Sequence, residues 1–191
     1  MNVVDRFAEA GDTPYLVVDR AAALTRPGAV VLDLCCGCGA VGAALLDAVP
    51  GIELHAADLD EAAVRCARRN LPGAQVHQGD LYGPLPRRLR GRIDVLVVIA
   101  PYVPSDAIRL MPPEARDHEP PTALDGGPDG LDVLRRILAD APSWMAPGGV
   151  LLTELGEDQL TTALTETARC GLVGRTVIAP DDSGCLLIAY R

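Results

Sequence analysis

Aromatic residues are scarce in this sequence, and its net charge has the wrong sign for a protein that binds nucleic acid. Only 3% of the 191 residues are aromatic, and 26 acidic residues outnumber 17 arginines and lysines, for a net charge of -9. Binding of RNA or DNA needs a basic track and commonly aromatic rings that stack on bases. The main basic cluster, 87–92, lies in a proline-flanked stretch that we interpret as a solvated turn. We therefore expect no nucleic acid among the partners.

Long apolar stretches are absent as well. No run reaches the roughly 18 apolar residues that a membrane-spanning helix needs. Near the start of the chain, Asp5, Arg6 and Glu9 occupy the region where a secretory signal peptide has its apolar core. We expect a cytoplasmic protein with no membrane partner.

The cysteines do not follow the spacing of a disulfide framework or of paired zinc-ligand motifs. Of the six, three crowd one turn within 35–38 and the other three are scattered along the chain. Small apolar side chains that fill a tight turn and a core explain this pattern better than ligands do. We therefore expect no metal site.

The stretch that organises the chain is 30–42, VVLDLCCGCGAVG. An apolar run typical of a central parallel strand ends near Asp33 and is followed by a short turn of glycines and cysteines. Gly37 and Gly39 allow a ligand to approach the backbone closely. The helix that we expect from Ala40 points its N-terminal amides at the same place. The stretch therefore predicts a nucleotide-type pocket at the carboxyl end of a strand.

The glycine spacing alone does not decide which nucleotide binds there. Residues 37–42 satisfy G-x-G-x-x-G, the pattern of dinucleotide sites, but this match is weak by itself. Asp33 precedes the turn and Asp58 ends the next expected strand. The charged amine and sulfonium of S-adenosylmethionine (SAM) suit an acidic turn better than a pyrophosphate does. SAM is therefore our predicted cofactor, with NAD as the alternative.

Acidic residues follow three successive expected strands and suggest how SAM is held. Asp58 can accept hydrogen bonds from two ribose hydroxyls, and Asp80 can accept one from the exocyclic amine of adenine. Such residues are also ordinary helix caps, but three in a row favour a binding site. Leu59 and Leu81 can sandwich the adenine ring. The full set of predicted cofactor residues is Asp33, Cys35, Gly37, Gly39, Asp58, Leu59, Asp80 and Leu81.

Alternating strand and helix patterns predict an α/β, Rossmann-like doubly wound fold with a mostly parallel seven-stranded sheet and a C-terminal antiparallel hairpin. Expected strands cover 30–34, 52–57, 75–77, 93–98, 150–154, 173–178 and 185–190, and expected helices cover 16–24, 40–49, 60–70, 131–145 and 159–170. We expect helix 16–24 to cover the edge of the sheet and Ala146-Pro147-Gly148-Gly149 to form a turn. Residues 1–27 are predicted to be a helical lead-in to a domain of residues 28–191. The proline-rich segment 100–129 has no clear period, and long segments of this kind are commonly functional.

Five motifs carry a resemblance to a known family. They are DLCCGCGAVG (33–42), AADLDEAAVRCARRN (56–70), GDLYGPL (79–85), APYVP (100–104) and EPPTALDGGPDGLD (119–132). Together they resemble class I SAM-dependent methyltransferases, and most closely the HemK/PrmC family, over about residues 28–190. That family methylates the glutamine of a Gly-Gly-Gln motif in translation release factors, and its members carry an additional N-terminal helical domain. The resemblance implies a SAM-dependent methyltransferase.

One position departs from the family pattern. The family motif after the fourth strand is Asn-Pro-Pro-Tyr or Asn-Ala-Pro-Tyr, whereas this sequence reads Ile99-Ala100-Pro101-Tyr102. In the family, the Asn oxygen and the next carbonyl accept hydrogen bonds from the substrate amide. The Ile99 side chain cannot accept one. The resemblance makes all four residues candidates for acceptor binding, with Tyr102 stacking on a planar acceptor.

Three functions remain compatible with the sequence. The first is a methyltransferase that acts on another acceptor, a small molecule or a peptide. The second is a HemK-like glutamine methyltransferase assisted by a protein partner, and the third is a SAM-binding protein that transfers no methyl group. Candidate catalytic residues are Tyr102, His118 and Glu119, and His118 is the most suitable general base by residue type.

Overall fold

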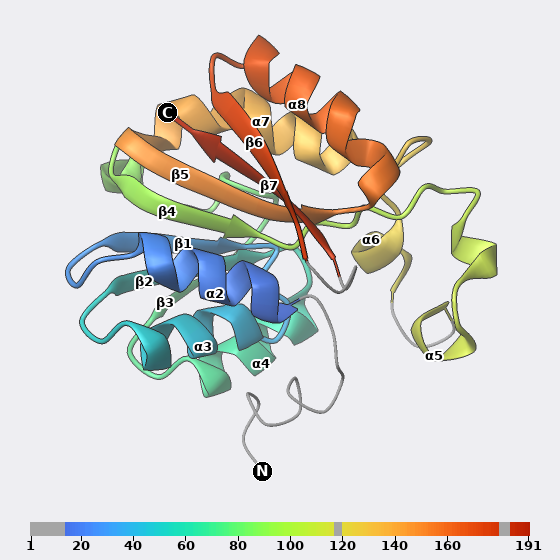
Figure 1. The fold of residues 1–191 in the computed structure, drawn as a ribbon. Coiled ribbons are helices and arrows are strands. Elements are labelled where there is room, and N and C mark those ends of the chain that lie inside the picture. The colour runs from blue at the N-terminus through green and yellow to red at the C-terminus, as the bar shows by residue number, and fades with distance from the viewer. Residues whose placement is uncertain (1–13, 117–119, 180–183) are drawn as a thin grey trace.

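The computed structural model describes residues 14–116, 120–179 and 184–191 (Figure 1). Its centre is a seven-stranded sheet in the order β3-β2-β1-β4-β5-β7-β6. The first five strands pair in parallel, and β7 pairs antiparallel with both β5 and β6. The strands are β1 (Val30–Leu34), β2 (Glu53–Asp58), β3 (Gln75–Gln78), β4 (Ile93–Val98), β5 (Met145–Leu155), β6 (Val173–Ile178) and β7 (Cys185–Tyr190). The predicted fold class is confirmed.

Helices cover both faces of the sheet, as Figure 1 shows. One face packs under α2, α3 and α4, and the other under α7 and α8. The helices are α2 (Pro14–Leu24), α3 (Ala40–Ala48), α4 (Glu61–Asn70), α5 (Pro113–Arg116), α6 (Pro121–Leu124), α7 (Asp132–Trp144) and α8 (Leu160–Arg169), with 3₁₀ turns η1 (Arg87–Leu89), η2 (Ile108–Leu110) and η3 (Glu157–Gln159). Because β1 to β5 are parallel, their carboxyl ends lie at one rim of the sheet.

Local sequence explains the elements that frame this rim. All five residues of β1 are buried, as the apolar run predicts for a central strand. In α4, the Asp60 side chain caps the helix by accepting a hydrogen bond from the Ala63 N–H at 2.8 Å, and Arg68 and Arg69 lie in the last turn. Both features favour a helix that starts just after β2. The rim is thus built by short strand-to-helix turns.

Helix α2 does not cover the sheet edge, so that prediction is wrong. It packs against α3 and over β4 and β5, near the middle of the sheet. Val17 and Ala21, one helical turn apart, are fully buried in this contact. A small apolar stripe allows the helix to lie flat on the sheet face, a position that the sequence pattern did not specify.

Strand β5 begins earlier than the sequence predicts. The expected turn at 146–149 instead lies within β5, where the pairing with β4 shifts from Ile93–Met145 to Val95–Val150. Gly148 has a positive φ of 77° in this irregularity. A glycine bulge therefore keeps the strand continuous where the Pro-Gly-Gly pattern suggests a break.

The segment 100–129 is mostly irregular in its described part, as its lack of period predicts. It contains η2, α5 and α6, and Figure 1 shows η2 and α5 on an arm that extends from the body of the domain. A single parallel bridge between Val103 and Asp125 joins the two ends of this arm. Among the helices that the structure describes, none combines the length and apolar character needed to cross a bilayer.

Candidate functional site

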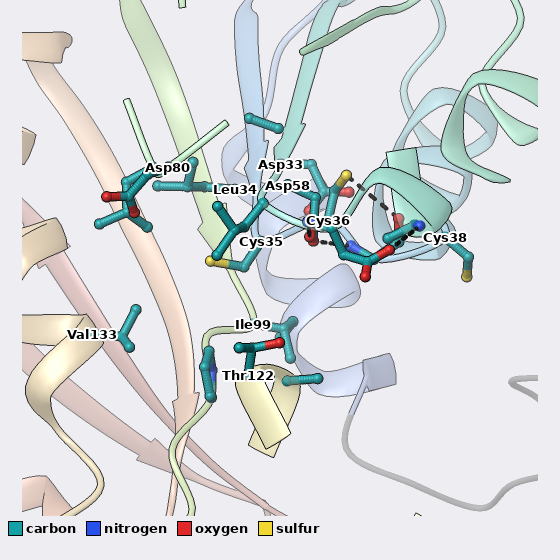
Figure 2. Close-up of a pocket in the computed structure, with 18 of the residues that line it drawn as sticks. Asp33, Leu34, Cys35, Cys36, Cys38, Asp58, Asp80, Ile99, Thr122 and Val133 are labelled. Carbon is teal, nitrogen blue, oxygen red and sulfur yellow. Dashed lines mark hydrogen bonds between the residues drawn. The ribbon is translucent and has the colours of Figure 1, made fainter. Parts of the chain in front are cut away.

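A pocket of about 800 Å³ opens at the carboxyl ends of β1, β2, β3 and β4. Figure 2 shows its residues converging from the turn after β1, the start of α4 and the segments that follow β3 and β4. Short segments at α6 and the first turns of α7 close the opposite side. Its lining includes Asp33–Val41 without Gly39, then Ala57–Asp60, Ala62, Ala63, Gly79–Leu81, Ile99, Pro101, Pro120, Thr122, Ala123, Val133 and Arg136.

Asp58 ties two turns of the pocket together. Its Oδ2 accepts a hydrogen bond from the Gly37 N–H at 2.8 Å, and its Oδ1 accepts one from the Asp60 N–H at 2.9 Å. Each carboxylate oxygen can accept a further hydrogen bond. The glycine turn after β1 and the entrance to α4 are therefore held in register by one side chain that also lines the pocket.

Asp33 is almost completely buried, and its carboxyl group accepts a hydrogen bond from the backbone. The Gly42 N–H donates to Oδ2 at 2.9 Å, which fastens the start of α3 to the end of β1. Burial raises the pKa of Asp33 to about 7, the Gly42 bond opposes this rise, and the negative charge of Asp58 adds to it. A positively charged ligand group in this pocket would stabilise the ionised form.

The two glycines predicted for the cofactor site have different roles. Gly37 lines the pocket with φ +54°, and a Cβ there would meet nothing within 4 Å, so a ligand can approach its backbone. Gly39 has φ +81° and does not line the pocket. A Cβ on Gly39 would lie 2.8 Å from Leu71 Cδ1, so this glycine serves the packing of α3 against α4. Its direct contact with the cofactor is not supported by its position.

Cys35 adopts a positive φ of 60°, which is unusual for a residue with a side chain. Its sulfur lies in the pocket, as Figure 2 shows. Burial raises the pKa of the Cys35 thiol to about 12, and the carboxylates of Asp58, Asp33 and Asp80 contribute in the same direction. The thiol is therefore protonated at neutral pH and acts as an apolar wall.

The residues predicted to surround the adenine ring lie in the pocket, together with one residue that was not predicted. Leu59, Asp80 and Leu81 all line the pocket. One oxygen of Asp80 is already paired with the Arg136 guanidinium at 2.5 Å, a contact between two exposed side chains. Arg136 is not among the residues that the sequence predicted for the cofactor. Val133 also lines the pocket, and its position three residues earlier on α7 puts both on one helix face, a spacing that could have indicated them.

The predicted acceptor residues divide into two groups. Ile99 and Pro101 line the pocket, whereas Ala100 is buried next to it. Tyr102 lies outside the lining, because its hydroxyl donates to Glu154 Oε1 at 3.1 Å. The structure therefore does not place the Tyr102 ring against an acceptor in this pocket. His118 and Glu119 lie outside the described residues.

The acceptor side contains further residues that the sequence analysis did not assign. Pro120, Thr122, Ala123 and Val133 line the pocket together with Ile99. In the view of Figure 2, Ile99 and Thr122 lie below Asp33 and Asp58. The quoted motif 119–132 contained three of these residues, but its sequence alone does not show which of them face the pocket.

Several known sequences that are similar to this chain are named as methyltransferases. Residues 18–107 match the family model of the methyltransferase small domain. A release factor glutamine methyltransferase from Streptomyces coelicolor is 40% identical over 131 residues, covering 68% of this chain and 46% of the relative. A 4-amino-L-phenylalanine/4-methylamino-L-phenylalanine methyltransferase from Streptomyces pristinaespiralis is 39% identical over 150 residues, covering 76% and 51%. The chain spans about half the length of these curated relatives.

Solved structures agree on the fold. A TehB-like SAM-dependent methyltransferase from Corynebacterium glutamicum superposes with a TM-score of 0.65 at 20% identity, covering 97% of this chain and 92% of the other. A SAM-bound amino pentose methyltransferase from Micromonospora echinaspora gives 0.61 at 16% identity, covering 100% and 92%. At these identities the likeness concerns the fold alone. Sequence similarity and fold together identify the chain as a HemK/PrmC-like class I SAM-dependent methyltransferase domain.

Proposed function

We propose that this domain transfers the methyl group of SAM to an amine nitrogen of a small molecule or peptide, rather than to a glutamine amide. The observation that carries the proposal is Ile99, an apolar side chain in the pocket wall where the family has an Asn. When bound, SAM supplies a methyl group activated by the neighbouring sulfonium. The chain supplies the binding, orientation and exclusion of water.

The pocket residues fit SAM in charge and shape. Asp33 is a carboxyl group whose pKa is raised by burial, and the ammonium and sulfonium of SAM would favour its ionised form. Asp58 keeps acceptor capacity for ribose hydroxyls beyond its two backbone bonds. Leu59 and Leu81 offer apolar surface for the adenine ring. We assign the cofactor to these residues and to the open backbone at Gly37.

The acceptor wall suits a nucleophile that has its own localised lone pair. An amide nitrogen shares its lone pair with the carbonyl, so its two N–H groups must be held for it to react. At Ile99 one of the two acceptors is missing, and an unpaired buried N–H costs about 1–3 kcal/mol. A neutral amine has an available lone pair and needs less alignment. The Ala100 carbonyl remains as one acceptor for an amine N–H.

The substrates of the relatives support two acceptor classes. The 39% identical relative from Streptomyces pristinaespiralis is named for 4-amino- and 4-methylamino-L-phenylalanine, whose aromatic amines are neutral at neutral pH and do not need the paired acceptors that an amide does. A second candidate is glutamine methylation of a protein, since the relative from Streptomyces coelicolor acts on a release factor and another from Bradyrhizobium diazoefficiens, 38% identical over 146 residues, on ribosomal protein uL3. Ile99 argues against this second candidate.

Transfer of labelled methyl groups from SAM tests the proposal. The wild type and Ile99→Asn are assayed with 4-amino-L-phenylalanine, a Gly-Gly-Gln peptide and a purified release factor. We expect the wild type to label the amine and not the glutamine acceptors. We expect Ile99→Asn to raise glutamine labelling about tenfold or more, from the restored acceptor. Efficient labelling of the release factor by the wild type would overturn the amine assignment.

A further inference from the structure

The carboxamide of Gln159 joins three separate segments behind the acceptor wall. Its Nε2 donates to the Tyr102 carbonyl at 2.8 Å and to the Asp129 carbonyl at 2.9 Å, and its Oε1 accepts from the Gly156 N–H at 2.9 Å. The whole residue is only 5% exposed. Both amide hydrogens and the oxygen are thus engaged, and no water competes strongly at this depth.

Two glycines, Gly126 and Gly130, allow their turn to pack closely against the backbone of Pro101 and Tyr102. A Cβ on Gly130 would lie within 2.1 Å of the Tyr102 carbonyl oxygen, and one on Gly126 within 2.7 Å of the Pro101 carbonyl oxygen. The Gly126 N–H also donates to the Val103 carbonyl at 2.9 Å. A Cβ on Gly130 would also lie 2.2 Å from Gln159 Nε2, so the absence of a side chain at Gly130 leaves room for the hydrogen bond from Gln159 to the Tyr102 carbonyl.

A second tether comes from the same end of β5. Tyr102 donates its hydroxyl to Glu154, five residues before Gln159 along the chain. The backbone and the ring of Tyr102 are thus both fixed from the β5 end. Ile99 and Pro101, which lie four and two positions before the bridge residue Val103, line the pocket. Because Tyr102 directly follows Pro101 in the chain, a movement of the Tyr102 carbonyl would also shift the pocket wall formed by Ile99 and Pro101.

The geometry points to Gln159 as a positioning residue that sets the acceptor wall at Ile99–Tyr102 without touching SAM or the acceptor. This role rests on the methyl transfer proposed above. A carboxamide is suited to it because it offers two donors and one acceptor at one place. A glutamate there has the same size but cannot donate, so two carbonyl oxygens would face a carboxylate. Gln159 does not line the pocket, so its replacement should leave SAM affinity nearly unchanged.

The experiment compares Gln159→Glu with the wild type and with Gln75→Glu. Gln75 is an exposed glutamine on the edge strand β3 whose Oε1 accepts from Arg88, so this control makes the same chemical change away from the wall. Three quantities are measured for each protein: SAM affinity by calorimetry, the Ile99 methyl signal by NMR in the SAM complex, and methyl transfer to 4-amino-L-phenylalanine. Gln159→Asn, which keeps an amide but shortens its reach, replaces Gln159→Glu if the latter does not fold.

We expect the Gln159 variant to keep SAM affinity within about threefold, to shift the Ile99 methyl signal and to lose about tenfold or more in kcat. Gln75→Glu should change none of the three. An unchanged Ile99 signal in a folded variant would overturn the positioning role, as would equal losses of SAM affinity and kcat. If no protein labels the amine, the proposed acceptor is wrong, and the Ile99 signal alone then decides the role of Gln159.

Discussion

The cofactor side and the acceptor side of the pocket are held together in different ways. On the cofactor side, carboxylates at strand ends accept hydrogen bonds from nearby turns, as Asp33 does from Gly42 and Asp58 from Gly37. On the acceptor side, the wall is fixed by side chains more than 50 positions away in the chain, because Gln159 and Glu154 both hold Tyr102. The cofactor side is therefore encoded locally in the sequence, whereas the acceptor side depends on the assembled fold.

The largest effect on SAM affinity is expected at Asp58, on the cofactor side of the pocket. Asp58→Ala removes two backbone hydrogen bonds and the predicted ribose acceptor, so we expect SAM affinity to fall about a hundredfold or more. Calorimetric titration measures it. Ile99→Asn is the matched control on the acceptor side and should bind SAM like the wild type. Similar SAM affinities for all three proteins would show that Asp58 is not a cofactor residue.

A second prediction separates structural from ligand-facing glycines. Gly39→Ala should lower the free energy of unfolding by about 1–3 kcal/mol, because of the positive φ and the contact with Leu71. Gly37→Ala, whose Cβ meets open space, should cost less stability but weaken SAM binding. Urea denaturation and calorimetry give the two quantities. The reverse ranking of the two variants in stability would contradict the roles assigned here.

A third prediction follows from the raised pKa of Asp33. Its pKa of about 7 in the folded protein exceeds the ordinary value of 3.8, so the folded state binds more protons between these values and stability falls as the pH rises through this window. A cation bound nearby favours the ionised form, so SAM affinity should rise with pH up to about 7, by at most about tenfold per unit. Calorimetric titration with SAM at pH values from about 5.5 to about 8, carried out on the wild type and on Asp33→Asn, measures this pH dependence.

Asp33→Asn removes the titrating group and should flatten the rise of SAM affinity below neutral pH. A rise of equal steepness in the variant would assign the pH dependence to another group.

The smallest effect is expected at the exposed pair of Arg136 and Asp80. Both side chains are more than half exposed, and surface ion pairs contribute about 0–1 kcal/mol. Arg136→Gln should therefore change SAM affinity less than about threefold. A larger loss in the same titration would place Arg136 in direct contact with the cofactor.

Sequence reasoning reached the cofactor side because its signals are local. A buried run that ends in Asp33, a glycine turn and a new helix define a strand-end pocket within 13 residues, and β1 and β4 have the predicted bounds. Seven of the eight predicted cofactor residues line the pocket, and Gly39 is the exception because its constraint is helix packing. These predictions required only alternation and turn chemistry.

The acceptor side was less predictable because its residues meet only after folding. Motif order indicated Ile99 and Pro101, but the direction of the Tyr102 side chain depends on Glu154, which comes from another strand. Gln159 lies at the start of an ordinary amphipathic helix pattern and carries no local signal of its three tethers. The same limit applies to α2, whose place on the sheet face depends on the packing of α3 beside it.

Calorimetric titration of the wild-type protein with SAM and, in parallel, with NAD tests the cofactor assignment. The glycine spacing at 37–42 and a ribose-binding carboxylate at Asp58 fit both cofactors, whereas the buried carboxyl group of Asp33 favours the cationic groups of SAM over a pyrophosphate. We predict saturable SAM binding with a Kd on the order of micromolar and no binding of NAD in the same range. NAD binding without SAM binding would contradict the cofactor assignment and every proposal about the acceptor that depends on it.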